Sequence, residues 1–151
     1  MNRFNFWYKW LLTVCSIMIA LGVIIAFCNQ TSLFYYFFNE HINSAFWNKE
    51  ELSVNILRFQ SWIYSVLGAT LIGWGVFLFF ITFYAFKERQ KWSWNCILLG
   101  ICSWYAVDTT ISISFEVYFN AIFNTILFLS IGTPLIFTSK YFNRRNKWTQ
   151  N

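Results

Sequence analysis

Four long stretches of the chain contain almost no charged side chain. They run from Trp10 to Cys28, from Phe59 to Phe86, from Trp92 to Phe115 and from Val117 to Ser139, and the only charge within them is Asp108. A helix crosses about 30 Å of hydrocarbon with about 20 residues, so each stretch is long enough to span a membrane. A membrane β-barrel would instead show alternating strands of about 10 residues. The sequence therefore predicts four membrane-spanning helices.

The composition indicates an integral membrane protein and excludes a water-soluble enzyme. Of the 151 residues, 58% are hydrophobic and only 11% are charged, whereas soluble domains carry about 25% charged residues. The net charge of +5 comes from short separate clusters, so it does not indicate nucleic-acid binding. We predict a single all-α membrane domain, a four-helix bundle with spans over about 10–28, 60–86, 92–113 and 117–139 and an outer loop over 29–59.

The first stretch also has some features of a cleaved signal peptide. Arg3 and Lys9 supply a basic region before it. However, the stretch is longer than the usual apolar core of a signal peptide, and Phe27 stands where a cleavage site needs a small residue. We expect a retained membrane span.

The positions of lysine and arginine predict how the chain is threaded. Nine of the eleven fall in the N-terminal tail, in the segment 87–91 or in the C-terminal tail, and only Lys49 and Arg58 fall in the first connection. Cytoplasmic loops carry the excess of positive charge. Both termini are therefore expected in the cytoplasm, which an even number of spans requires.

The first connection contains an aromatic part and a polar part. Residues 33–38 are too aromatic for water and too short to span, so we expect an interfacial amphipathic helix on the outer side, with a re-entrant segment as the alternative. Asn48 followed by Glu51 has the spacing of a helix N-cap with an acidic third residue. A helix starting there would continue into the second span.

The short connections and the small residues predict how the spans pack. The segments at 87–91 and 108–117 are short, so we expect the second span beside the third and the third beside the fourth. The second span carries small residues that allow close helix approach, which predicts that it is the most buried helix. These are Ser61, Ser65, Ala69 and Gly73, with Gly68 and Gly75 beside them. Pro134 is expected to bend the fourth span.

Asp108 is the one carboxylate inside a span, and an immersed acid needs polar partners. Counting residues from the inner ends places several polar side chains at a similar depth, and two tryptophans one turn further in. We predict that this cluster consists of Asp108, Asn124, Asn120, Ser112 and Thr70, with Trp74 and Trp104 as its floor.

The cluster has a structural and a functional interpretation. Polar side chains join membrane helices, so the cluster is expected to act first as a link between helices. Alternatively, it lines a pocket that opens outward and binds a small or lipid-like molecule, and proton-coupled transport or chemistry is a third possibility. Arg58 lies too far out along its helix to reach Asp108, and we expect it to pair with Glu116 instead.

The remaining reactive residues predict no catalytic or metal site. Cys15, Cys28, Cys96 and Cys102 form no CxxC pair, and His41 is the only histidine, expected in the outer loop as an interfacial polar residue. We therefore expect no cofactor, no metal and no disulfide. The residue pattern does not favour an enzyme.

Five short segments resemble a loose group of small bacterial four-span inner-membrane proteins of unassigned function. The segments are Arg58-Phe59-Gln60, Leu67-Gly68-Ala69-Thr70, Gly73-Trp74-Gly75, Trp92-Ser93-Trp94 and Asp108-Thr109. The resemblance covers about two-thirds of the chain and implies a bacterial inner-membrane location. The layout is also faintly similar to that of DoxX-like membrane proteins, at the level of topology only. The expected function is structural or accessory, with lipid and a partner helix as contacts; the alternative is a lipid-binding or transport-related role of the Asp108 pocket.

Overall fold

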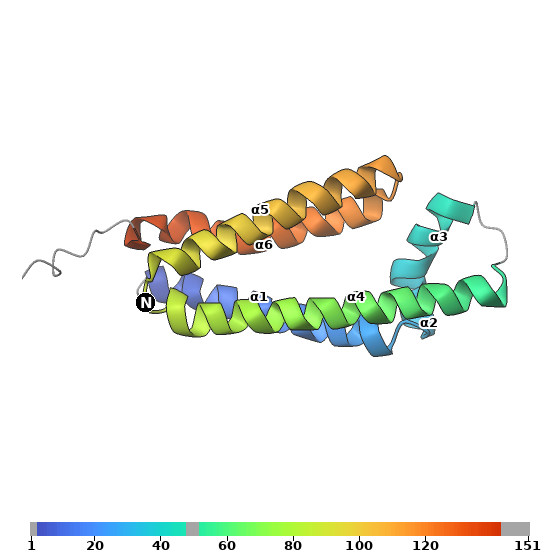
Figure 1. The fold of residues 1–151 in the computed structure, drawn as a ribbon, viewed down its shortest axis with the longest axis horizontal. Coiled ribbons are helices and arrows are strands. Elements are labelled where there is room, and N and C mark those ends of the chain that lie inside the picture. Colours follow the sequence, from blue (N-terminus) through green and yellow to red (C-terminus); the bar gives the residue numbers. More distant parts are fainter. Residues whose placement is uncertain (1–2, 48–51, 143–151) are drawn as a thin grey trace, which may run out of the picture.

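The computed structural model describes residues 3–47 and 52–142 (Figure 1). It contains four long helices that are apolar enough to cross a membrane. They are α1 (Arg3–Phe27), α4 (Val54–Phe80) with its π-helical continuation η2 (Ile81–Phe86), α5 (Lys91–Ser114) and α6 (Tyr118–Phe142). The predicted all-α fold with four spans is therefore confirmed. The first two spans begin earlier than predicted, at Arg3 and Val54, because helix continues into the polar flanks of the apolar stretches.

The four helices pair as two hairpins (Figure 1). α1 packs along α4, α5 packs along α6, and the hairpins touch each other mainly through α1 and α6. The prediction that the second and third spans are neighbours is wrong for most of their length. α5 contacts η2 near the connecting turn, and beyond that point α4 and α5 diverge. A short turn sets only where two helices start, whereas their faces decide what they pack against.

Small residues bring α1 and α4 close together. A Cβ atom on Gly68 would lie 2.4 Å from the backbone nitrogen of Ala26, and one on Gly22 would lie 2.8 Å from the carbonyl oxygen of Gly68. Ser65 continues this face, since its hydroxyl donates to the carbonyl oxygen of Ala26 at 2.9 Å. Glycine at these positions lets the two backbones touch.

The predicted stripe of small residues on α4 is correct only in part. A Cβ atom on Gly73 would meet nothing within 4 Å among the described residues, and Ala69 is exposed. The packed face instead runs through Ser61, Ser65, Gly68 and Gly75. α4 is also not the most buried helix: over their most apolar stretches, 22% of α4 is buried, against 28% of α1 and of α6. The reason is that α4 packs along one helix only.

Aromatic rings close one end of the molecule. Phe4, Phe86 and Phe142 lie with their ring centroids 4.7–6.2 Å apart, which joins α1, η2 and α6. Arg89 has a positive φ of 56° in the α4–α5 turn, and its guanidinium lies 4.8 Å from the ring centroid of Phe4. We call this the closed end; the buried aliphatic core, with Leu11, Met18, Ile97, Ile101, Ile131 and Leu135, extends from it.

Pro134 lies within α6 and is buried. Proline has no backbone N–H, so the carbonyl oxygen of Ser130 lacks its helical donor. The indole N–H of Trp10 in α1 donates to that oxygen at 3.0 Å. This bond ties the first hairpin to the second.

The other end of the molecule, which we call the splayed end, is crossed by the first connection. α2 (Ser32–Phe34), η1 (Tyr35–Asn39) and α3 (Glu40–Trp47) follow one another there and form the outer segment. The ring of Phe34 packs on Tyr64 of α4, while Phe38 packs on Phe119 of α6, so the outer segment contacts both hairpins. The helix predicted to start at Asn48 falls largely on 48–51, outside the described residues. Leu52 and Ser53 are not helical, and α4 begins only at Val54.

Candidate ligand-binding site

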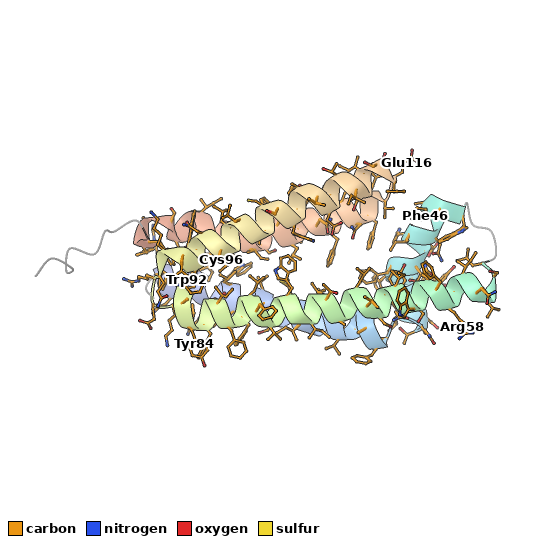
Figure 2. All side chains as sticks on the ribbon, in the orientation of Figure 1. Phe46, Arg58, Tyr84, Trp92, Cys96 and Glu116 are labelled. Atoms are coloured by element: carbon orange, nitrogen blue, oxygen red, sulfur yellow. The ribbon has the colours of Figure 1, made fainter. Side chains whose placement is uncertain are left out.

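The two hairpins diverge toward the splayed end (Figure 2). A cavity of about 560 Å³ lies between them. Small-molecule sites in proteins measure about 300–1,000 Å³, so the cavity has the size of a ligand site. α1, the outer segment and the three other long helices all contribute to its wall. The lining residues are Ile25, Phe34, Phe38, Ile42, Tyr64, Leu67, Thr70, Leu71, Trp74, Gly100, Trp104, Asp108, Phe119, Asn120, Phe123, Asn124 and Leu127.

One face of α5 brings Asp108 to this cavity. Gly100, Trp104 and Asp108 follow at intervals of four residues and all three line the cavity, since residues four apart lie on the same side of a helix. Glycine leaves open space at the inner part of this face. From its inner to its outer part, this face of α5 therefore presents open space at Gly100, the indole ring of Trp104 and the carboxyl group of Asp108.

The carboxyl group of Asp108 accepts hydrogen bonds from three side chains. The indole N–H of Trp104 donates to Oδ2 at 3.0 Å, and the side-chain amide of Asn120 donates to Oδ1 at 2.9 Å. The hydroxyl of Ser112 also reaches Oδ1, at 3.2 Å. An ionised carboxylate only accepts hydrogen bonds, and all three partners are donors. The surroundings of Asp108 therefore suit a carboxylate.

Most residues of the predicted cluster lie at the cavity. Six of the seven line the cavity: Asp108, Asn124, Asn120, Thr70, Trp74 and Trp104. Ser112 is buried and does not line the cavity, but its hydroxyl bonds to Asp108. Trp74 and Trp104 meet across the two hairpins with their ring centroids 5.2 Å apart. Thr70 lines the wall with its hydroxyl bonded to its own helix, at the carbonyl oxygen of Val66.

Asn124 is 2% exposed, and its side-chain Nδ2 has no hydrogen-bond partner within the described part of the chain. Buried polar atoms are usually paired, so this unpaired donor in the cavity wall marks a polar region that protein groups do not fully satisfy.

The rest of the wall is aromatic or aliphatic. Among the lining residues that the structure describes, Asp108 alone has a charged side chain. Seven aromatic residues line the same cavity, from α4, α5, α6 and the outer segment. The cavity wall is therefore apolar over most of its surface and acidic at one place, Asp108.

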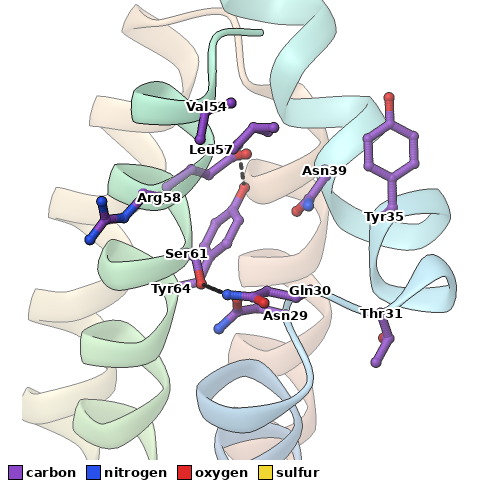
Figure 3. A pocket seen from close by; sticks show the side chains of 11 residues that line it. Asn29, Gln30, Thr31, Tyr35, Asn39, Val54, Leu57, Arg58, Ser61 and Tyr64 are labelled. Atoms are coloured by element: carbon purple, nitrogen blue, oxygen red, sulfur yellow. Dashed lines mark hydrogen bonds between the residues drawn. The ribbon is translucent and has the colours of Figure 1, made fainter.

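A second, smaller pocket of about 340 Å³ lies beside the outer segment (Figure 3). Its wall is polar: Asn29 accepts from the hydroxyl of Ser61 at 2.7 Å, and Gln60 donates to the hydroxyl of Tyr64 at 3.2 Å. Arg58 stands at its edge. The sequence analysis missed this pocket, because its wall forms only where the α1–α2 connection and η1 meet α4.

Arg58 and Glu116 do not meet as the outer ion pair predicted from the sequence. Arg58 lies on α4 near the splayed end, whereas Glu116 lies in the α5–α6 turn of the other hairpin (Figure 2). The prediction placed both at the same depth, but the divergence of the hairpins separates them laterally.

The reactive side chains lie apart from one another. Within residues 3–47 and 52–142, no group of three or more His, Cys, Asp or Glu side chains is placed to hold a metal ion. The four cysteines are unpaired. His41 stacks on Phe119, with ring centroids 4.8 Å apart, and lies outside the cavity lining.

Several lining residues escaped the sequence analysis, and only some carried a signal. Gly100 continues the four-residue spacing of Trp104 and Asp108, and Phe123 stands three residues after Asn120, so helical spacing finds both. Phe34, Phe38 and Ile42 belong to the outer segment, whose docking across the splayed end has no signal in the sequence. No protein-family model, curated protein or solved structure matches this chain.

Proposed function

We propose that this small multi-pass membrane protein binds an amphiphilic, lipid-like molecule in the cavity between its hairpins. The observation that carries the proposal is the cavity itself, in which an acidic polar corner at Asp108 faces an aromatic and aliphatic wall. Ligand sites have this composition: they are mostly apolar, with a few placed polar groups. An amphiphile matches it with a polar head at Asp108 and a chain along the wall.

The hydrogen bonds of the polar cluster join α5 to α6, as a structural role requires, but they leave the space between the two hairpins open to a ligand. Within the described residues, Asp108 bonds only to Trp104 and Ser112 on its own helix and to Asn120 on α6. All of these belong to the second hairpin, so the cluster does not tie the two hairpins together. A polar link between hairpins would reach α1 or α4.

An accessory role, in which the protein holds a partner membrane helix, is the second candidate. Gly73 on α4 and Gly132 on α6 favour it, because a Cβ atom at either position would meet nothing within 4 Å among the described residues. A partner helix has room to approach closely there.

The charge distribution and the resemblance to bacterial four-span proteins support a location in the bacterial inner membrane with cytoplasmic termini. In that orientation the closed end lies on the cytoplasmic side. The cavity then opens in the outer half of the bilayer, where lipid chains have lateral access to it.

Gly100 provides a sharp test, because it lines the cavity and a Cβ atom there meets open space. Gly100→Trp is expected to fill the cavity without moving the backbone. The control is Gly132→Trp, on α6, which has the same open space but lies outside the cavity lining. The probe is a lysophosphatidylcholine with a photoactivatable diazirine in its chain, added to the purified protein in dodecyl maltoside, and labelled residues are mapped by mass spectrometry.

We expect label on residues of the cavity wall in the wild type and in Gly132→Trp, and at least a tenfold loss in Gly100→Trp. Equal labelling of all three proteins, or label confined to the outer faces of the helices, would overturn the proposal. Loss in both variants alike would point to the accessory role instead.

A further inference from the structure

We infer that the polar group of the bound amphiphile is an organic cation, an alkylammonium held by Asp108 among aromatic rings. This inference rests on the proposed function and names the chemistry of its ligand. Two independent features of the cavity carry it, the charge of the wall and the identity of the rings.

The charged groups in the cavity wall are of one sign only, negative. Asp108 is the only charged side chain among the lining residues of the described chain, and its three hydrogen-bond partners are the neutral side chains of Trp104, Asn120 and Ser112. Charges attract strongly where water is excluded, because the effective dielectric constant is low. A ligand cation is therefore the natural counter-charge, and an anionic head would be repelled.

The carboxylate keeps capacity for such a ligand. Its two oxygens offer about four acceptor positions. Trp104 and Asn120 each fill one position, and the Ser112 hydroxyl shares its hydrogen between Oδ1 at 3.2 Å and the backbone carbonyl oxygen of Asp108 at 2.7 Å. An ammonium head that donates a hydrogen bond takes the remaining position, whereas a quaternary head gains the charge attraction alone.

Aromatic rings line the cavity that holds the carboxyl group of Asp108, and one of them, Trp104, bonds to it directly. Trp104 donates to Asp108 and packs against Trp74, and Phe119 and Phe123 line the wall on α6 beside Asn120. The negative faces of aromatic rings attract cations within about 6 Å, and rings of this kind recognise quaternary ammonium groups. Neutral and anionic heads gain nothing comparable from these rings.

Ammonium amphiphiles have two sources, a free long-chain amine and a lipid with a choline headgroup. Both present the same cation to Asp108, and they differ in the phosphate that only the lipid carries. The test therefore compares both kinds with an anion of equal chain length.

The experiment measures competition against the diazirine lysophosphatidylcholine in dodecyl maltoside. The competitors are dodecyltrimethylammonium, dodecanoate and unlabelled lysophosphatidylcholine. Asp108→Asn removes the charge while keeping the shape, and Glu116→Gln removes one carboxylate from the same hairpin outside the cavity. Trp74→Leu removes a ring that has no hydrogen bond to Asp108, and it serves where Asp108→Asn does not fold.

We expect dodecyltrimethylammonium to compete at least tenfold better than dodecanoate in the wild type and in Glu116→Gln. Asp108→Asn should abolish this preference, and Trp74→Leu should reduce it severalfold. Stronger competition by the lysolipid than by the free amine would support a lipid source, and the reverse order a free amine.

The inference is overturned if dodecanoate competes as well as the ammonium, or if Asp108→Asn keeps the preference. Those results leave the proposed function standing, since the cavity is still labelled. If the probe fails to label the cavity of the wild type, the proposed function itself fails.

Discussion

Trp10 and Pro134 show how one residue compensates for another on a different helix. Pro134 removes the backbone donor that would bond the carbonyl oxygen of Ser130, and the indole N–H of Trp10 replaces it at 3.0 Å. In the sequence, Trp10 marks the start of the first apolar stretch and Pro134 predicts a bend. Neither pattern contains the bond, because 120 residues separate donor and acceptor.

Trp10→Phe is expected to destabilise the protein by about 1 kcal/mol. The ring keeps most of its apolar contact but loses the donor, and a single hydrogen bond contributes about 0.5–1.5 kcal/mol. Unfolding in mixed micelles with increasing sodium dodecyl sulfate, followed by circular dichroism, measures the change. The control is Trp62→Phe on α4, where the ring is 59% exposed; equal effects of the two substitutions would contradict the role of the bond.

The surroundings of Asp108 were predictable from the sequence only in part. Depth along the helices placed Asn124 and Thr70 level with Asp108, and Asn120, Ser112 and Trp104 one turn away. Among the described residues, the carboxyl group bonds to the side chains one turn away and not to Asn124 or Thr70. The unpaired Nδ2 of Asn124 depends on side-chain orientation, which depth does not determine.

The glycines of α1 and α4 are the clearest case at the scale of elements. Gly68→Ala is expected to cost about 1–3 kcal/mol, because the added Cβ would lie 2.4 Å from the backbone nitrogen of Ala26 and force the helices apart. Gly73→Ala adds the same atom where nothing lies within 4 Å among the described residues. It should be neutral or stabilise the helix by about 0.5–1 kcal/mol.

The same unfolding assay compares the two alanine variants. A silent Gly68→Ala would show that the α1–α4 contact is not as close as described, and a destabilised Gly73→Ala would show that Gly73 does not face open space. The sequence prediction placed Gly73 in the packed stripe and Gly68 beside it, and the structure reverses this order, since which face meets α1 is a property of the pair of helices.

The outer segment is an element whose structure was only partly predictable. Its aromatic composition indicated a short helix away from water, and a helical segment is found there. Its contacts with Tyr64 and Phe119 were not predictable, because they join residues of three elements without a shared period.

At the scale of the whole molecule, the proposed threading places the splayed end outside and the closed end in the cytoplasm. Cys28 follows the last residue of α1 at the splayed end and is exposed, whereas Glu88 is exposed in the α4–α5 turn at the closed end. A membrane-impermeant maleimide added to intact cells is expected to modify Cys28. It should not modify Glu88→Cys in a protein with Cys28 replaced by serine until the cells are permeabilised.

The opposite pattern, with position 88 labelled in intact cells, would reverse the orientation. It would move the cavity to the inner half of the bilayer and leave the helix packing unchanged. The fold and the threading are therefore tested separately.

The number of spans, their approximate positions and the depth of the polar cluster followed from the sequence, because hydrophobic length and helical rise are local properties of a chain in lipid. The pairing of the third span with the fourth also followed from their short connection and is confirmed, whereas the pairing of α1 with α4 and the separation of α4 from α5 were decided only in the tertiary structure. In lipid, helices associate by close packing of complementary faces, and that complementarity exists only between two surfaces. The cavity beside Asp108 is a consequence of this pairing, since it occupies the space where the two hairpins part.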